Sequence, residues 1–207
     1  MRESDGGEMG EVDKKPSGMI IIISGPSGVG KGTICGRLLE EDMGLAISAS
    51  ATTRDQNQSE IDGENYFFFS DEAFQELVDH DAFLEWAEVH GRRYGTLQSK
   101  VREILESGRD CLLEIDVQGG LQVSQKIPKS CVTIFIKAPS EEELIKRITG
   151  RGRGHDDIKR RMMTARWEMT QEEVYQYSVV NDSLDEAVDE VLRIIREERI
   201  SHASAID

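Results

Sequence analysis

The sequence predicts an α/β fold in which a doubly wound parallel sheet carries helices on both faces. Two observations favour this class. Short apolar runs of strand length alternate with segments of helical spacing along most of the 207 residues. The first apolar run, 19–23, leads directly into a glycine-rich loop and then into a helix. Because parallel strands end at one edge of the sheet, we expect ligands to bind at that edge.

The glycine-rich loop spans residues 24–33 and indicates phosphate binding. Its four glycines let successive backbone N–H groups turn toward one anion, and the following helix adds its own unpaired N–H groups. Lys31 supplies a mobile charge for the terminal phosphates. The spacing from Gly25 to Lys31, between a strand and a helix, favours this interpretation over a structural turn. Gly32 stands where Ser or Thr normally offers a hydroxyl to Mg²⁺, so Thr33 or water is the alternative ligand.

Composition limits the classes of partner. The formal charge of −15 argues against a general nucleic-acid binder, although a local basic site remains compatible with it. Residues 1–18 are polar, lack the apolar stretch of a signal peptide and are expected to form a flexible tail. No run is long enough to cross a membrane. Cys35, Cys111 and Cys131 are widely spaced, lie in apolar surroundings and form no paired motif. We therefore expect buried, reduced thiols and a cytoplasmic location.

The first half of the chain predicts part of the α/β core and then an insertion. The expected elements are a strand at 19–23, a helix through Ile34 and Leu38, a strand at 45–51, a strand at 66–69, a helix capped by Ser70, an extended run at 83–86 and a hydrophilic turn at 90–95. Residues from about 50 to 97 depart from the alternating pattern around them, which indicates an inserted region.

The second half returns to alternating strands and helices. The expected elements are a helix ending at Gly108, a strand at 111–116, a short helix at 121–125, a strand at 132–138, a helix capped by Ser140, a helix at 162–176, a strand at 177–180 and a helix capped by Ser183 that runs through Ile195.

Two clusters of charged residues are expected to lie near the phosphate site. Glu114 and Asp116 end a buried strand, where a carboxylate needs a cation, either Mg²⁺ or a neighbouring Lys or Arg. The segment 146–161 concentrates positive charge and contains three glycines, as expected of arginines that close over phosphates. The alternative for this segment is a solvated helix face balanced by the acidic residues 141–143.

A third group lies in the inserted region. Arg54 with the hydroxyls of Tyr66 and Tyr94 can hold a phosphate, and Glu85 with Ser50 can read the edge of a purine. From the residues alone, packing roles for the tyrosines and a surface position for Glu85 remain open.

The chain resembles the guanylate kinase family from about residue 19 to residue 198. The matching stretches are SGPSGVGK at 24–31, SATTR at 50–54, EIDG at 60–63 with Tyr66, FLEW at 83–86, HG at 90–91, YGT at 94–96, LEIDVQG at 113–119, RG at 151–152 and VVND at 179–182. The resemblance implies a P-loop core at 19–49, 98–140 and 164–207, a mixed α+β nucleoside-monophosphate-binding region at 50–97 and a helical lid at 141–163.

The resemblance also implies a reaction, ATP:GMP phosphotransfer with Mg²⁺, with GMP or dGMP as acceptor, in purine nucleotide metabolism. It implies ATP contacts from Gly25, Pro26, Ser27, Gly28, Val29, Gly30, Lys31, Gly32, Thr33 and Asn181. It implies GMP contacts from Ser50, Arg54, Tyr66, Glu85, Tyr94, Gly95, Thr96 and Asp116. Catalytic roles would fall to Lys31, Arg54, Arg151 and Arg161, and Asp116 and Glu114 would lie near Mg²⁺, directly or through water.

The chain departs from the family pattern in the acceptor region and in the lid. Asn57 stands where the family commonly has a second arginine, and a charged phosphate contact is worth about 1.5–3 kcal/mol. We hypothesise that Arg92 or Arg93 replaces it. Arg153 stands where a threonine is usual, and the lid is one residue short.

Two other functions stay open as alternatives. A non-catalytic phosphopeptide-binding module of this fold would lose the loop or its lysine, and this chain keeps both. A sugar-phosphate kinase of the same fold is kept open by Asn57, whereas Glu85 with Ser50 favours guanine.

Overall fold

The protein is described from a computed structural model, which places residues 18–89, 91–127, 131–150 and 155–206. Its core is a parallel sheet in the order β2-β7-β1-β8-β9. The strands are β1 Ile20–Ser24, β2 Leu45–Ile47, β7 Asp110–Glu114, β8 Cys131–Lys137 and β9 Tyr177–Val180. This arrangement confirms the predicted parallel α/β core.

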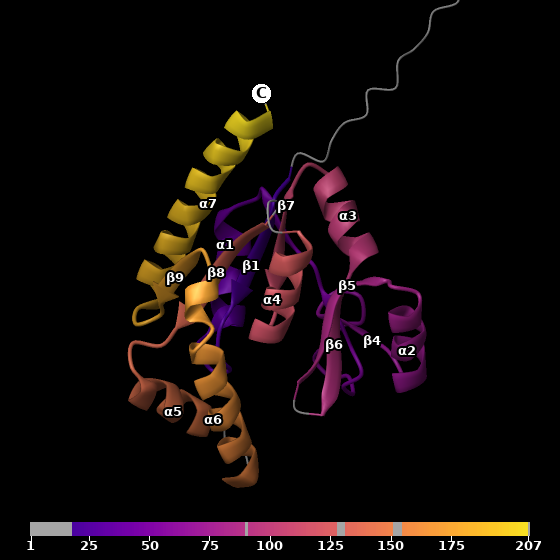
Figure 1. Cartoon of the computed structure of the whole chain (residues 1–207), viewed down its shortest axis with the longest axis vertical. Coiled ribbons are helices and arrows are strands. Elements are labelled where there is room, and N and C mark those ends of the chain that lie inside the picture. The colour runs from indigo at the N-terminus through magenta and orange to yellow at the C-terminus, as the bar shows by residue number, and fades with distance from the viewer. Residues whose placement is uncertain (1–17, 90, 128–130, 151–154, 207) are drawn as a thin grey trace, which may run out of the picture.

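Helices cover both faces of this sheet (Figure 1). Ile21 and Ile23 of β1 pack with helices α1 (Lys31–Glu41) and α7 (Leu184–Ile206). The alternate residues Ile20 and Ile22 pack on the other side with α3 (Gln98–Glu106) and α4 (Val117–Lys126). An uninterrupted isoleucine run therefore forms a strand that is buried on both faces. Of the three cysteines, Cys35 lies in the first layer, and Cys111 and Cys131 lie in the second.

A second, mixed sheet has the order β4-β3-β6-β5. Its strands are β3 Ser50–Thr52, β4 Tyr66–Phe68, β5 Phe83–Val89 and β6 Arg92–Leu97. Helix α2 (Asp71–Asp79) packs on this sheet through Phe74, which meets Ala51 and Phe83. The Ser70 hydroxyl accepts the Ala73 N–H and caps the helix, as predicted.

Two predictions in this region are wrong. The strand expected at 45–51 is two strands in different sheets, because the Ser48 N–H bonds to Leu112 of the core while Ser50 already pairs with Tyr66. The hydrophilic turn expected at 90–95 is mostly strand β6. Successive side chains of β6 point to opposite faces of the sheet, so its polar residues are divided between the two faces. Before the strand, Gly91 has φ of 79° and is the turn residue that the structure describes there.

Helices α5 (Glu141–Thr149) and α6 (His155–Met169) lie at the same end of the molecule as the second sheet (Figure 1). The Ser140 hydroxyl accepts the Glu143 N–H and caps α5, as predicted. The helix expected at 162–176 begins earlier and ends at Met169. After the helix, the Gln171 N–H donates to the Glu168 carbonyl oxygen, and a short 3₁₀ helix, Glu172–Val174, follows. Helix α7 extends beyond Ile195 to Ile206.

Candidate active site

The glycine-rich loop joins the end of β1 to the start of α1. Gly25 has φ of 135°, and a Cβ there would lie 2.1 Å from the Ile136 carbonyl oxygen of β8. Gly30 has φ of 95° and is the N-cap residue of α1. Both positions require glycine, because other residues rarely adopt this backbone and one of them has no room for a side chain. The loop is thus pressed against the sheet with the N–H groups of α1 directly behind it.

Two cations reach this loop from different helices. The Lys31 ammonium donates to the carbonyl oxygens of Gly25, at 2.6 Å, and Pro26, at 3.2 Å. The guanidinium of Arg161, on α6, donates to the Ser27 hydroxyl at 3.2 Å. The resemblance implies catalytic roles for both Lys31 and Arg161, and both side chains contact the same loop.

Two cavities meet at the carboxyl ends of the core strands. The larger, ≈ 540 Å³, is lined by the loop, Glu88 and Val89 of β5, and Thr164 and Glu168 of α6. The smaller, ≈ 150 Å³, is lined by Ser50, Tyr66, Glu85, Ala87, Val89, Tyr94 and Ile115. Lys31, Glu114 and Asp116 line both cavities. The structure therefore brings together side chains that the sequence separates by more than sixty residues.

Glu85 is a buried carboxyl in the smaller cavity. The Thr96 hydroxyl donates to its Oε1 at 2.6 Å. Burial raises the pKa of Glu85 to about 7, and the nearby Asp116 adds to the rise while Thr96 opposes it. A Cβ on Gly119 would lie 2.5 Å from Oε2 of Glu85 and 3.4 Å from Oδ1 of Asp116. Gly119 thus lets two carboxyl groups converge.

Glu114 and Asp116 lie at and just after the end of β7, where both carboxyl groups interact with the charge of Lys31. Asp116 accepts the Gly119 N–H at 2.7 Å and caps α4. Burial raises the pKa of both carboxyl groups, and Lys31 opposes the rise for each. A Cβ on Gly32 would lie 3.4 Å from both oxygens of Glu114. The Glu114 carboxyl group therefore lies beside the position that a side chain at residue 32 would take.

The described residues contain no group of three acidic, histidine or cysteine side chains that could hold a metal ion alone. Glu114 and Asp116 nevertheless offer the hard oxygen donors that Mg²⁺ prefers, and Mg²⁺ usually keeps several waters and phosphate oxygens as ligands. The two carboxyl groups fit a metal that arrives with a nucleotide.

Arg54 lies beside Tyr66, which lines the smaller cavity. Its guanidinium donates to both oxygens of Glu60, at 2.8 and 3.0 Å, and lies 5.0 Å from the centre of the Tyr66 ring. The Tyr66 and Tyr94 rings meet edge to face at 6.2 Å. Gly95 follows in β6, where a Cβ would lie 2.9 Å from the Glu85 carbonyl oxygen.

Asn181, for which the resemblance implies an ATP contact, binds the phosphate loop from behind. The Asn181 side-chain amide donates to the Val29 carbonyl of the loop at 2.7 Å. Its own backbone carbonyl accepts Arg147 of α5 at 3.0 Å. Asn181 is therefore a buried support of the loop. Arg151 lies outside the described residues, as does Arg153.

Sequence reasoning missed Glu168 of α6. It is only 6% exposed, lines the larger cavity, and its Oε2 has no hydrogen-bond partner. Burial raises the pKa of Glu168 to about 7, with Lys31 opposing the rise. The available signal was its spacing of seven residues from Arg161, which places both side chains on one face of a helix.

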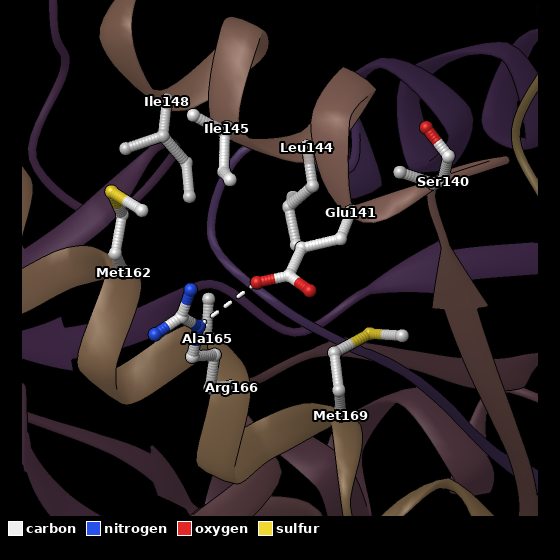
Figure 2. A pocket seen from close by; sticks show the side chains of 10 residues that line it. Ser140, Glu141, Leu144, Ile145, Ile148, Met162, Ala165, Arg166 and Met169 are labelled. Carbon is white, nitrogen blue, oxygen red and sulfur yellow. Dashed lines mark hydrogen bonds and ion pairs between the residues drawn. The ribbon is translucent and has the colours of Figure 1, made fainter.

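A third cavity, ≈ 200 Å³, lies between α5 and α6. Figure 2 shows its mainly apolar lining, with Leu144 and Ile148 on one side and Met162 and Met169 on the other. An ion pair of 2.9 Å between Glu141 and Arg166 crosses between the two helices. No residue of the phosphate loop lines this cavity, so it is separate from the polar site.

The fold and the site define a phosphate-loop protein with two adjoining polar cavities, the arrangement expected of a phosphotransferase. The sequence model of guanylate kinase matches residues 17–198. The guanylate kinase of Caldanaerobacter subterraneus is 47% identical over 89% of this chain and 90% of its own length. That of Halalkalibacterium halodurans is 43% identical over 94% of this chain and 95% of its own.

A solved structure agrees with these relatives. The crystal structure of guanylate kinase from Anaplasma phagocytophilum matches with a TM-score of 0.74 and 32% identity, over 88% of this chain and 86% of that one. The chain belongs to the guanylate kinase family. Among the helices that the structure describes, none is long and apolar enough to cross a membrane.

Proposed function

We propose that this protein is a working guanylate kinase, which transfers the γ-phosphoryl group of ATP to GMP or dGMP and yields ADP and GDP. The observation that carries the proposal is the meeting of two cavities at Lys31, Glu114 and Asp116. One cavity contains the phosphate loop, and the other contains a buried carboxyl group suited to guanine. Phosphoryl transfer requires the two substrates to meet in line at such a point.

The donor side would hold ATP by its phosphates. Backbone N–H groups from Gly28 to Thr33 would bind the phosphate oxygens, and Lys31 would exchange its carbonyl partners for them. Arg161, already at Ser27, would neutralise charge that develops in transfer, together with Arg151. Asn181 supports ATP binding through its bond to Val29.

The acceptor side would hold GMP at both ends. Glu85, with Ser50 and Asp116, would accept the N–H donors of guanine, while adenine would leave a buried acceptor without a donor. Arg54 and the hydroxyls of Tyr66 and Tyr94 would bind the phosphate. Thr96 orients Glu85.

Mg²⁺ is part of the proposal, with Glu114 and Asp116 holding it directly or through water. When bound, it would neutralise charge on the ATP phosphates. The GMP phosphate is itself the anionic nucleophile, so these residues need to position and stabilise rather than act as a strong base. A cytoplasmic location belongs to the proposal, since the three cysteines are free thiols. A role in purine nucleotide metabolism belongs to it because the proposed reaction converts GMP to GDP.

The two alternatives have less support. A phosphopeptide-binding module would not need Lys31 and Arg161 at one intact loop. Sugar hydroxyls could also donate to Glu85, so the preference for guanine over a sugar phosphate rests on the guanylate kinase relatives that match most of the chain.

The test is coupled ADP release with ATP and Mg²⁺, comparing GMP with AMP, CMP and UMP. We expect turnover confined to guanine nucleotides. Lys31→Ala should lower kcat at least about a hundredfold, because it removes a charge aimed at the transferred group. Lys100→Ala is the matched control, since Lys100 on α3 pairs with Glu103 at 2.8 Å and lines neither cavity. A folded protein without GMP turnover would contradict the proposal.

A further inference from the structure

The further inference rests on the proposed function and concerns how the acceptor's phosphate is held. We propose that Arg92 is the second cation for the GMP phosphate, acting beside Arg54. Arg92 begins β6, the strand that also carries Tyr94 into the acceptor cavity.

The alternation of β6 separates Arg92 from Arg93. Successive side chains of a strand point to opposite faces, so Arg92 shares the face of Tyr94, which lines the cavity. Arg93 lies on the other face. Its guanidinium donates to Gln75 and to Asp71 of α2, each at 3.0 Å, and lies 4.9 Å from the centre of the Phe74 ring. The structure thus argues against Arg93 as the replacement arginine.

The register of β3 and β6 directs Arg92 toward the segment that contains Arg54. Ala51 pairs with Gly95 and Thr52 with Tyr94 in an antiparallel ladder. The Thr53 N–H bonds to the Arg93 carbonyl at 3.0 Å, which continues the pairing by one residue. β3 ends at Thr52, and the chain continuing from it in this register would carry Arg54 toward Arg92 at the start of β6.

An observed contact agrees with this register. The Arg92 guanidinium lies 3.7 Å from the carboxylate of Asp55, the residue that follows Arg54. The Asp55 side chain is 97% exposed and that of Arg92 is 48% exposed. An ion pair this long and this exposed is screened by water and holds Arg92 only weakly. Arg92 can therefore exchange Asp55 for a phosphate at little cost.

The carboxylate of Glu60 already neutralises Arg54, so binding a phosphate would require a second cation. Glu60 binds the Arg54 guanidinium through both of its oxygens and also accepts the Asn57 N–H at 2.8 Å. Arg54 thus meets a dianionic phosphate with its charge already matched by a carboxylate. Asn57 adds no charge, whereas Arg92 supplies one on the same side of the sheet.

The experiment compares two neighbouring arginines that face opposite ways. Calorimetry would measure binding of GMP and of guanosine to the wild-type protein, Arg92→Ala and Arg93→Ala. We expect Arg92→Ala to weaken GMP binding about tenfold or more and to leave guanosine binding unchanged. Arg93→Ala should lower the melting temperature, because it frees α2, and leave GMP binding within twofold.

A rescue variant makes the test stricter. Asn57→Arg in the Arg92→Ala background should restore most of the lost GMP affinity, since it returns a cation to the segment that follows Arg54. Equal weakening of GMP and guanosine, or a loss under twofold in Arg92→Ala, would overturn the role of Arg92. A wild-type protein that binds neither guanosine nor GMP would instead overturn the proposed function, so the two failures are distinguishable.

Discussion

At the scale of single residues, Glu85 shows how burial tunes a recognition group. The carboxyl group is 4% exposed, and its pKa is raised to about 7 by burial, with Asp116 adding to the rise. Without bound guanine, a large fraction of the Glu85 carboxyl groups is therefore protonated near neutral pH. Guanine offers N–H donors, which only the ionised carboxylate can accept fully. Binding and ionisation of Glu85 are thus coupled.

This coupling predicts a pH dependence for GMP binding. Below pH 7 the protein must lose a proton from Glu85 before it binds guanine, so affinity should rise as pH increases from 6 to 8 and then level off. Calorimetric titration with GMP across this range measures the effect. The GMP phosphate itself titrates near pH 6, so guanosine serves as a second ligand.

Glu85→Gln is the matched variant for this prediction. It keeps the shape of the side chain but cannot titrate, so guanosine affinity should be lower and nearly independent of pH between 6 and 8. An identical pH profile in wild type and variant would assign the dependence to another group.

At the scale of elements, the phosphate loop depends on its neighbours. β8 contacts it at Gly25, and Asn181, directly after β9, donates to Val29. The loop is thus fixed by two strands that follow it by more than a hundred residues. A loop with a prearranged set of N–H groups binds an anion without first being ordered.

Removing the Asn181 amide tests this support. Asn181→Ala leaves the Val29 carbonyl without its partner, which should cost about 1 kcal/mol of unfolding free energy and raise KM for ATP several-fold. KM for GMP should change less than twofold. Urea unfolding and steady-state kinetics measure both quantities. Asp182→Ala, at an exposed neighbouring position, is the control, and equal effects on both substrates would argue against a loop-specific role.

The elements also show what sequence reasoning can reach. The loop was predictable, because a strand, its glycines, Lys31 and a helix are consecutive in the chain. The split of 45–51 was not, since one continuous stretch gives strands to two different sheets. Glu168 escaped for a related reason, and the sequence left Arg92 and Arg93 as alternatives for the second phosphate contact. Their roles depend on helix packing and on strand register, which local patterns do not encode.

At the scale of the whole molecule, the C-terminal helix α7 is anchored at a point where three other elements end or begin. Arg199 donates to Asp42, after α1, and to Asp110, at the start of β7, each at 2.6 Å. Asp110 also accepts the Met19 N–H just before β1, at 2.7 Å. These contacts link distant parts of the chain, and none of their residues lines the two polar cavities.

This anchor predicts stability without an effect on chemistry. Arg199→Met leaves the buried carboxylate of Asp110 and the partly buried carboxylate of Asp42 without their cation. Because the Arg199 side chain is itself 33% exposed, we expect a loss of about 2 kcal/mol in unfolding free energy, less than for a fully buried pair. kcat/KM should stay within twofold at a temperature where the variant is folded. Urea unfolding checks the first outcome.

Arg193→Met is the control for Arg199→Met. Arg193 lies on the same helix, but its pairs with Glu190 and Glu197 are exposed and should contribute little. Equal losses in the two variants would mean that the position of Arg199 has no special importance.

The three buried cysteines can be used to measure local opening of the fold, because each one reacts only when solvent reaches it. Cys35 lies on one side of the parallel sheet, and Cys111 and Cys131 lie on the other. Burial raises the pKa of each thiol, that of Cys111 to about 12. Thiol reagents attack the thiolate, so the folded protein resists alkylation. The rate at which each cysteine is alkylated therefore reports how often its own side of the molecule admits solvent.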